Sequence, residues 1–306
     1  MNATEKPRTV AIAFCSDSLM EVPLHVAASS LLRHLPEDVV AHFYFLLVGF
    51  SESGRTGLRK TLEATGHPCQ VTFLPEEPVI DAFRNCAKLH GSTAPYYRLM
   101  LPRLIDEPRF LYLDADTLPL IDVTPLFEVE MGEHVTGFIV DGQVAWNLEH
   151  QFFYALGRSA DSPTFNSGVM LARPPLWQQQ GCWEKVLAFL EKYGPQLLSH
   201  DQTVLNALFA ENCFHMNPRF NIKVYPRRDS SISQEPGIYH FVGVPKPWDM
   251  GGRTLLPYAG PWFDALKTTA LPASKKTLWL NAGYWKRAPH LLGGYKRLLK
   301  NARPKS

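Results

Sequence analysis

The sequence predicts an α/β fold with a mainly parallel central sheet flanked by helices. Short apolar segments of the kind that form buried strands alternate along the chain with segments whose apolar residues recur at helical spacing. Such alternation is typical of parallel sheets that carry helices on both faces. The chain has 306 residues, of which 45% are hydrophobic and 20% charged, so it is long enough to bury one large core.

The first half of the chain supplies most of the predicted sheet. Each predicted strand is a short apolar run, and the strands cover residues 10–14, 42–48, 71–74, 110–113 and 135–140. Helical spacing predicts helices over residues 23–34, 54–65, 183–193 and 201–210, and Pro95 precedes a further helix that ends before Asp106. Ligands of such sheets bind outside the carboxyl ends of the strands, where Asp17, Asp114 and Asp116 are expected.

Asp114 and Asp116 are the first candidates for a functional site. Side chains alternate along an extended backbone, so the two carboxylates can point the same way, where they repel unless a cation lies between them. A divalent metal meets that requirement, because hard cations prefer carboxylate oxygens. The alternative is that one of the two caps a turn while the other is solvated.

The segment from His240 to Trp248 is the second candidate. It brings an imidazole, Gly243 and Lys246 together within nine residues, and its prolines exclude a regular helix. Histidine is the commonest nitrogen ligand of transition metals, glycine lets a ligand approach the backbone, and lysine supplies charge for a phosphate. Taken alone, the segment also fits a packed, proline-rich surface loop.

Together with Asp114-Ala115-Asp116, this segment resembles the retaining glycosyltransferases of family 8, which include bacterial lipooligosaccharide galactosyltransferases, glycogenin and galactinol synthase. Motifs similar to those of the family follow in the same order from about Val10 to Trp248. They are Tyr96-Tyr97-Arg98, Phe165-Asn166-Ser167-Gly168-Val169, Asp201-Gln202-Thr203-Val204-Leu205-Asn206, Asn217-Pro218-Arg219-Phe220-Asn221 and the His240 segment itself. The resemblance implies a GT-A type fold for nucleotide-diphospho-sugar transfer.

The resemblance also implies a role for the matched residues. Asp114, Asp116 and His240 would hold Mn²⁺, with Mg²⁺ as the alternative ion, on the diphosphate of a UDP-sugar, where the metal acts as a Lewis acid on the departing UDP. The donor-binding candidates are Cys15, Asp17, Arg98, Asp114, Ala115, Asp141, Asn166, Gly243 and Lys246. Asp141 follows the fifth predicted strand and is a candidate partner of a sugar hydroxyl. For Asp17, a turn-capping role is the alternative to a nucleotide contact.

Gln202 and Asp201 are the catalytic candidates. Retention of configuration requires either a nucleophile near the anomeric carbon or a front-face exchange within an ion pair. Asp201 is the acid of the local motif, and Thr203 stands where some relatives carry another Asp. We therefore expect the front-face route, with Gln202 stabilising the oxocarbenium-like centre. The alternative to a catalytic role for Asp201 is that it caps the N-terminus of the following helix.

Residues 265–306 differ from the rest of the chain in charge. They contain ten Lys or Arg and no Asp or Glu, and aromatic residues and leucines lie between the cations. This composition suits an interfacial helix on an anionic membrane, and a helix packed on the core is the alternative. We therefore expect a catalytic domain over residues 1–264 and a basic, aromatic extension over 265–306.

The lengths of the apolar runs, the cysteines and the other motifs indicate the cellular compartment and the partners that we expect. No apolar run has the length of a membrane span or of a signal-peptide core, so we expect a cytoplasmic protein, peripheral on the inner face of the membrane if the extension binds it. The five cysteines lack metal-ligand spacing, and no nucleic-acid motif is found. The expected donor is UDP-glucose or UDP-galactose, and the acceptor a glycan, a lipid-linked sugar or a small polyol. A non-catalytic nucleotide-sugar binding protein is the alternative.

Overall fold

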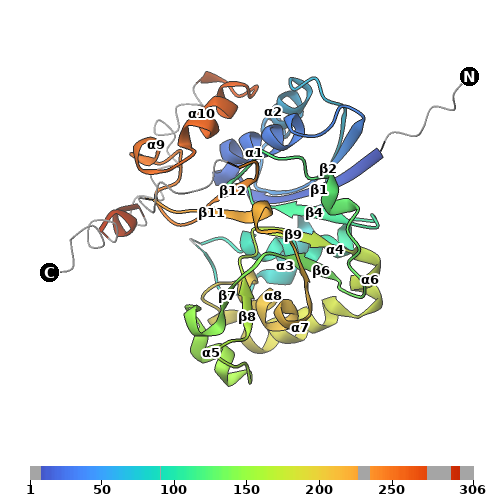
Figure 1. Cartoon of the computed structure of the whole chain (residues 1–306), viewed down its shortest axis with the longest axis vertical. Helices are drawn as coiled ribbons and strands as arrows, with labels where there is room; N and C mark the ends of the chain where they lie inside the picture. Colours follow the sequence, from blue (N-terminus) through green and yellow to red (C-terminus); the bar gives the residue numbers. More distant parts are fainter. Residues whose placement is uncertain (1–7, 90, 227–234, 274–290, 297–306) are drawn as a thin grey trace, which may run out of the picture.

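The computed structural model describes residues 8–89, 91–226, 235–273 and 291–296. Its main sheet consists of β1 (Arg8–Asp17), β2 (Val39–Val48), β3 (Cys69–Phe73), β4 (Phe110–Leu113), β6 (Thr136–Phe138), β9 (Val169–Ala172) and β10 (Phe214–His215). The strand order is β10-β6-β9-β4-β1-β2-β3, and helices cover both faces (Figure 1). β9 runs antiparallel to its neighbours β4 and β6, and the other pairs are parallel. The predicted α/β class with a mainly parallel sheet is confirmed.

The alternating side chains of β1 serve two cores. Val10, Ile12 and Phe14 pack on the face covered by α1 (Glu21–Arg33) and α2 (Glu52–Glu63). Ala11, Ala13 and Cys15 contribute to the opposite core. The helices of that core are α3 (Glu77–Phe83), α4 (Leu101–Leu104), α6 (Pro174–Gln179), α7 (Cys182–Tyr193) and α8 (Asp201–Phe209). Because β1 and β4 are parallel neighbours, their carboxyl ends meet at one edge of the sheet.

Two small sheets lie beside this edge. One has the order β11-β12-β5 and is formed by β5 (Thr117–Pro119), β11 (Ile222–Val224) and β12 (Ile238–Phe241). β12 runs antiparallel to β5 and sets His240 opposite Thr117. The other sheet pairs β7 (Val140–Gln143) with β8 (Pro163–Phe165). These sheets carry residues from distant parts of the sequence to the carboxyl end of β4.

The remaining elements are short. The α-helices are α5 (His150–Ala155), α9 (Gly252–Leu255) and α10 (Ala259–Lys267). The 3-10 helices are η1 (Ser18–Met20), η2 (Ala94–Met100), η3 (Thr124–Phe127), η4 (Val144–Trp146), η5 (Gly194–Gln196), η6 (Ala210–Asn212) and η7 (Pro218–Asn221).

Several features of the main sheet and its helices differ from the sequence prediction, which also lacks β10, α3 and α6. The single helix expected after Pro95 is η2 followed by α4, and Pro102 occupies the first turn of α4, where a missing N–H is tolerated. The strand expected over residues 135–140 divides into β6 and β7, which belong to different sheets. The apolar pattern does not predict β9, a four-residue antiparallel strand between β4 and β6.

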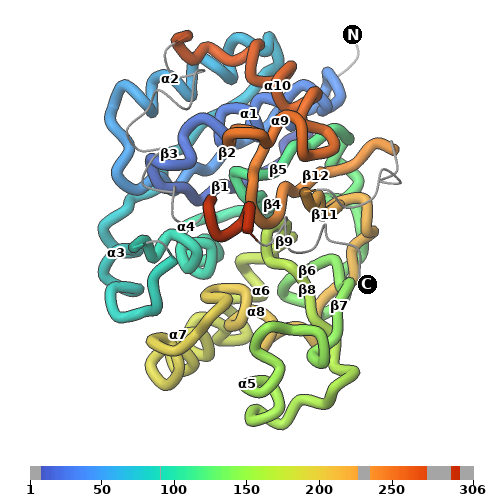
Figure 2. The backbone as a smooth tube through the Cα atoms, turned by 90° about the vertical axis from the view of Figure 1, so that its left-hand side faces the viewer, coloured from blue at the N-terminus to red at the C-terminus, as the bar shows by residue number. Residues whose placement is uncertain are grey.

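The C-terminal extension is described only in part. α10 runs across residue 264 and packs against α1, and Trp262 and Leu266 join a core that includes Val22 (Figure 2). In residues 291–296, Leu291 and Tyr295 pack with Val244. The basic aromatic segments 277–280 and 284–287 lie outside the described residues. Among the described residues, no helix is both long and apolar enough to cross a bilayer.

Candidate active site

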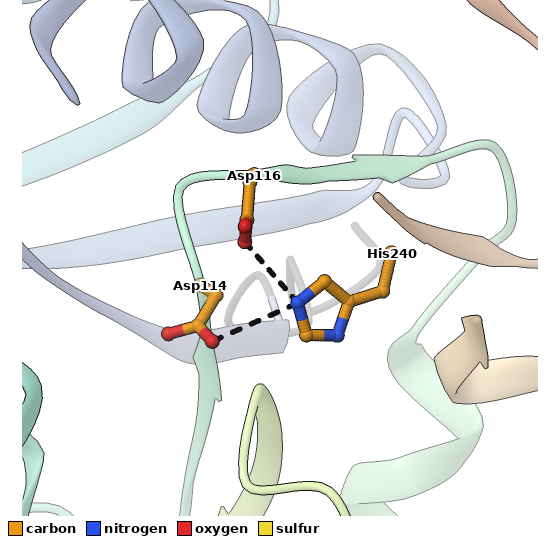
Figure 3. Close-up of side chains that lie close together, drawn as sticks. All are labelled: Asp114, Asp116 and His240. Carbon is orange, nitrogen blue, oxygen red and sulfur yellow. Dashed lines mark ion pairs between the residues drawn. The ribbon is translucent and has the colours of Figure 1, made fainter. Parts of the chain in front are cut away.

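The structure brings Asp114, Asp116 and His240 together. The loop after β4 carries both carboxylates, and β12 carries the imidazole toward them (Figure 3). His240 Nε2 lies 3.2 Å from an oxygen of Asp116 and 3.8 Å from an oxygen of Asp114. One donor atom from each residue fits within 4.8 Å of the others. Two carboxylates and one imidazole at this spacing can hold a single divalent metal ion.

A chain of side-chain amides fixes the ring of His240. His240 Nδ1 lies 3.0 Å from Asn221 Oδ1, and Asn221 Nδ2 donates to Asn166 Oδ1 at 3.1 Å. Asn166 Nδ2 in turn donates to Gln202 Oε1 at 3.1 Å. Because Asn221 presents an oxygen to Nδ1, that nitrogen carries a ring proton, and Nε2, which faces the carboxylates, is the nitrogen that would coordinate a metal.

Gly168 leaves the space in which His240 and Asp114 lie. It stands between β8 and β9, and its carbonyl accepts the N–H of Asp114 at 2.8 Å. A Cβ at this position would lie 2.1 Å from His240 Cε1 and 2.8 Å from Asp114 Oδ2. A glycine is therefore required here by close approach, the reason for which glycine is common beside ligand sites.

Lys246 adds a cation to the same place. Its Nζ lies 2.6 Å from Asp116 Oδ2 and also donates to the carbonyl of Phe241. Burial raises the pKa of Asp116, but the charges of Lys246 and His240 and their hydrogen bonds outweigh burial and hold that pKa below its ordinary value. Asp116 is consequently ionised at neutral pH, the form in which a carboxylate could bind a metal.

Arg98 is a buried cation shared by two carboxylates. Its Nη2 lies 2.9 Å from Asp114 and its Nε 2.9 Å from Asp201, while Nη1 donates to the carbonyl of Ser167 at 2.7 Å. The Tyr112 ring lies 4.6 Å from the guanidinium carbon, and its hydroxyl donates to Asp114 at 2.6 Å. Burial alone lowers the pKa of Arg98, but the two carboxylates raise it above its ordinary value, so the guanidinium stays charged.

Asp201 and Gln202 begin α8, and the N-cap interpretation of Asp201 is wrong. His200 occupies the N-cap position. The buried carboxylate of Asp201 bonds Arg98 and accepts the hydroxyl of Ser167 at 2.9 Å instead. Gln202 is half-buried, and its Oε1 also accepts the N–H of Ser167 at 3.3 Å. The amide chain thus joins Gln202 to His240, the candidate metal ligand.

A cavity of about 370 Å³ opens beside these groups. Eight of the predicted donor-binding and metal-binding residues line it, namely Cys15, Asp17, Arg98, Asp114, Ala115, Asp116, Gly243 and Lys246. Asp17 also accepts the N–H of Leu19 at 3.0 Å, so it has the turn-capping role as well as a place in the cavity wall. Burial raises the pKa of the Cys15 thiol, which is therefore neutral at pH 7.

The cavity wall does not include the other predicted residues. His240, Asn166, Gln202 and Asp201 lie in the amide chain and the Arg98 cluster behind it. Asp141 lies apart from both, on β7, where its carboxylate is 2.6 Å from Lys223 Nζ of β11.

Comparison with known proteins assigns the chain to a family. The model of glycosyl transferase family 8 matches residues 11–251. The chain belongs to this family. It is a glycosyltransferase by family, and the resemblance carried by its motifs is confirmed.

Relatives within and around family 8 are distant in sequence. General stress protein A of Bacillus subtilis is 24% identical over 282 residues, covering 86% of this chain and 95% of that protein. Lipopolysaccharide 1,3-galactosyltransferase of Salmonella typhimurium is 26% identical over 170 residues, covering 52% of this chain and 50% of that protein. The galactosyltransferase LgtC, solved with donor and acceptor sugar analogues, has a TM-score of 0.73 at 24% identity, covering 88% of this chain and all of that one. This likeness supports the GT-A fold.

Sequence reasoning missed several residues of the family 8 site. Asn221 belongs to a matched motif but is not among the site candidates, yet it orients His240, and Tyr112 lies in a strand whose other residues are apolar. Ser167 belongs to a recognised motif, but only the fold reveals that it bonds both Arg98 and Asp201. A polar residue inside an apolar strand, as at Tyr112, is the signal that could have found one of them.

We predict that Gly168→Ala weakens Mn²⁺ binding about 10- to 100-fold, because the added Cβ displaces His240 and Asp114. Calorimetric titration of the folded variant with Mn²⁺ measures the change. Gly260→Ala is the matched control, since a Cβ there meets no atom within 4 Å. Equal affinity in Gly168→Ala and the wild type would contradict the site.

A second prediction concerns Asp201 and pH. Burial raises the pKa of its carboxyl to about 6, against the opposing charge of Arg98. Because this pKa lies above the value in an unfolded chain, the folded state binds the proton more tightly, and stability falls as pH rises through that interval. The free energy of unfolding of Asp201→Asn relative to wild type should therefore rise by roughly 2 kcal/mol between about pH 4 and pH 7.

Urea denaturation of both proteins at intervals of one pH unit measures this difference. A constant offset between them reflects the lost contacts with Arg98 and Ser167 and does not affect the slope. A difference that stays flat, or falls as pH rises, would show that the Asp201 carboxyl is not protonated in this range.

Proposed function

We propose that the chain transfers glucose or galactose from a UDP-sugar, with retention of configuration, to a glycan or a lipid-linked sugar. The observation that carries this proposal is the cluster of Asp114, Asp116 and His240, whose two carboxylates line a cavity together with Lys246. A site with two carboxylates, an imidazole and an ammonium suits a metal-bound diphosphate, which no single one of these groups could hold.

We assign the diphosphate of the donor to the end of the cavity lined by Asp114, Asp116 and Lys246. Bound Mn²⁺, with Mg²⁺ as the alternative, would act as a Lewis acid on the departing UDP. The mixed oxygen and imidazole ligand set favours Mn²⁺. Lys246 supplies further positive charge where negative charge develops as the glycosidic bond breaks. We assign the nucleoside to the part of the cavity lined by Cys15 and Asp17.

The contacts of Asp201 and Gln202 favour a front-face reaction. A nucleophilic Asp201 would have to leave both Arg98 and Ser167, its partners in a buried cluster. Gln202 is held by Asn166 and the backbone of Ser167 through its oxygen, in a half-buried position. We therefore assign Gln202 to stabilising the oxocarbenium-like centre and Asp201 to orienting Arg98. Double displacement through Asp201 is the alternative route.

We assign the acceptor to the side of the site formed by residues 142–164. Trp146 and Leu148 of this segment are 76% and 74% exposed, unusual for large apolar side chains. Asp141 precedes the segment and, with Lys223, offers a charged pair for sugar hydroxyls. A small polyol, as for galactinol synthase, or a protein is the alternative acceptor.

We also propose that the basic extension attaches the catalytic domain, residues 1–264, to an anionic membrane surface on its cytoplasmic side. Its ten cations and interleaved aromatic residues support this assignment. A non-catalytic protein that only binds nucleotide sugars is the second candidate function, and the complete set of Asp114, Asp116 and His240 argues against it.

Release of UDP tests the proposal. We expect the wild type to release UDP from UDP-glucose or UDP-galactose in the presence of Mn²⁺, and Asp116→Asn and His240→Ala to lose at least about a hundredfold in rate. The expected loss arises because each substitution removes a metal ligand. Asp264→Asn is the matched control, since that carboxylate is exposed and pairs only with Lys267 among the described residues.

Calorimetric titration with UDP in the same samples separates binding from turnover. Mn²⁺-dependent binding without turnover would favour the nucleotide-sugar binding protein. If UDP-sugars are neither bound nor turned over in the presence of Mn²⁺ or Mg²⁺, the proposed donor is wrong.

A further inference from the structure

Glu149 is a buried carboxylate outside the motifs of the family. It stands just before α5 and is only 6% exposed. In the described residues, no Lys, Arg or His forms an ion pair with it, and its side chain does not cap α5. Burying an anion without a cation is costly, so its hydrogen bonds must compensate for the lost hydration.

Among the described residues, the donors of the hydrogen bonds that this carboxylate accepts lie at the start of α8 and in the loop before it. Oε1 accepts the N–H of Leu198 at 2.8 Å, and Oε2 accepts the N–H of Ser199 at 2.9 Å. The hydroxyl of Thr203 also donates to Oε2. Glu149 therefore accepts hydrogen bonds from residues on both sides of Asp201 and Gln202.

The peptide between these contacts is strained. His200 has φ of 54° and ψ of −123°, a backbone conformation that a residue with a side chain adopts only when its surroundings impose it. Glu149 bonds the residue before His200 and the residue three positions after it. The Ser199 carbonyl accepts the N–H of Gln202 at 3.1 Å. Because Glu149 holds Ser199 in place, it also fixes the backbone position of Gln202, the catalytic candidate.

We propose that Glu149 is a positioning residue that fixes Gln202 and Asp201 against the donor site through the loop before α8. This inference rests on the proposed function. It adds to that function a residue that contacts neither donor nor metal ligands and that acts through the loop before α8.

The test compares four variants of the full chain. Glu149→Gln retains the size of the side chain but leaves one amide N–H of the loop without an acceptor, because an NH₂ group cannot accept it. Thr203→Val removes only the hydroxyl bond, and Thr203→Ser restores it. Glu211→Gln is the matched control, since this half-exposed carboxylate joins Arg158 and Ser162 to the other end of α8.

We expect kcat for sugar transfer to fall about 10- to 100-fold in Glu149→Gln, because small misplacements of reacting groups cost rates of this size. Thr203→Val should show a smaller loss, whereas Thr203→Ser and Glu211→Gln stay within about twofold of the wild type. The affinity for UDP with Mn²⁺, measured by calorimetry, should stay within about twofold in all four, because Glu149 does not line the cavity.

Hydrogen exchange gives a readout that needs no turnover. Amides of residues 198–203 should exchange faster in Glu149→Gln than in the wild type, while those of residues 240–248 do not change. A kcat within threefold of wild type, unchanged exchange over residues 198–203, or UDP affinity that falls together with kcat would each overturn the positioning role. A wild type that turns over no UDP-sugar would instead defeat the proposed function, and exchange would still decide whether Glu149 holds the loop.

Discussion

The site depends on the shared charge of Arg98. Three carboxylates, those of Asp114, Asp116 and Asp201, lie within one partly buried cluster that contains two cations, Arg98 and Lys246. Counting these groups gives one net negative charge with a neutral His240, and a divalent metal would turn it into one net positive charge. That balance suits a dianionic or trianionic diphosphate, whereas the same cluster without Arg98 would have no net charge with the metal bound and would leave Asp114 and Asp201 without their shared buried cation.

The topology explains why these groups meet. β1 and β4 end side by side, so the cavity and the Asp-x-Asp loop share one edge of the sheet. β12 returns beside β5 and delivers His240, and the turn at Gly168 leaves room for the imidazole. The amide chain through Asn221 and Asn166 then connects His240 by hydrogen bonds to Gln202, which lies 36 residues after Asn166 in the sequence.

Local patterns made much of this predictable. Apolar runs predict β1, β2, β3 and β4, because a parallel strand that is buried on both faces consists mostly of apolar residues. The order of the motifs predicts the family and the residues that meet at the candidate metal site. Such patterns do not predict the antiparallel strand β9, because a run of four apolar residues does not indicate whether the strand runs parallel or antiparallel to its neighbours. The contacts of Ser167 and Glu149 are also invisible, since each arises from residues more than thirty positions away.

Pulsed EPR of Mn²⁺ bound to the protein with UDP tests the central claim most directly, because it reports the ligands of the metal itself. The account predicts phosphorus couplings from the diphosphate together with a nitrogen coupling from His240, and the nitrogen coupling disappears in His240→Ala. Phosphorus couplings without any nitrogen coupling in the wild type, or a nitrogen coupling that persists in the variant, would contradict a metal centre formed by Asp114, Asp116 and His240.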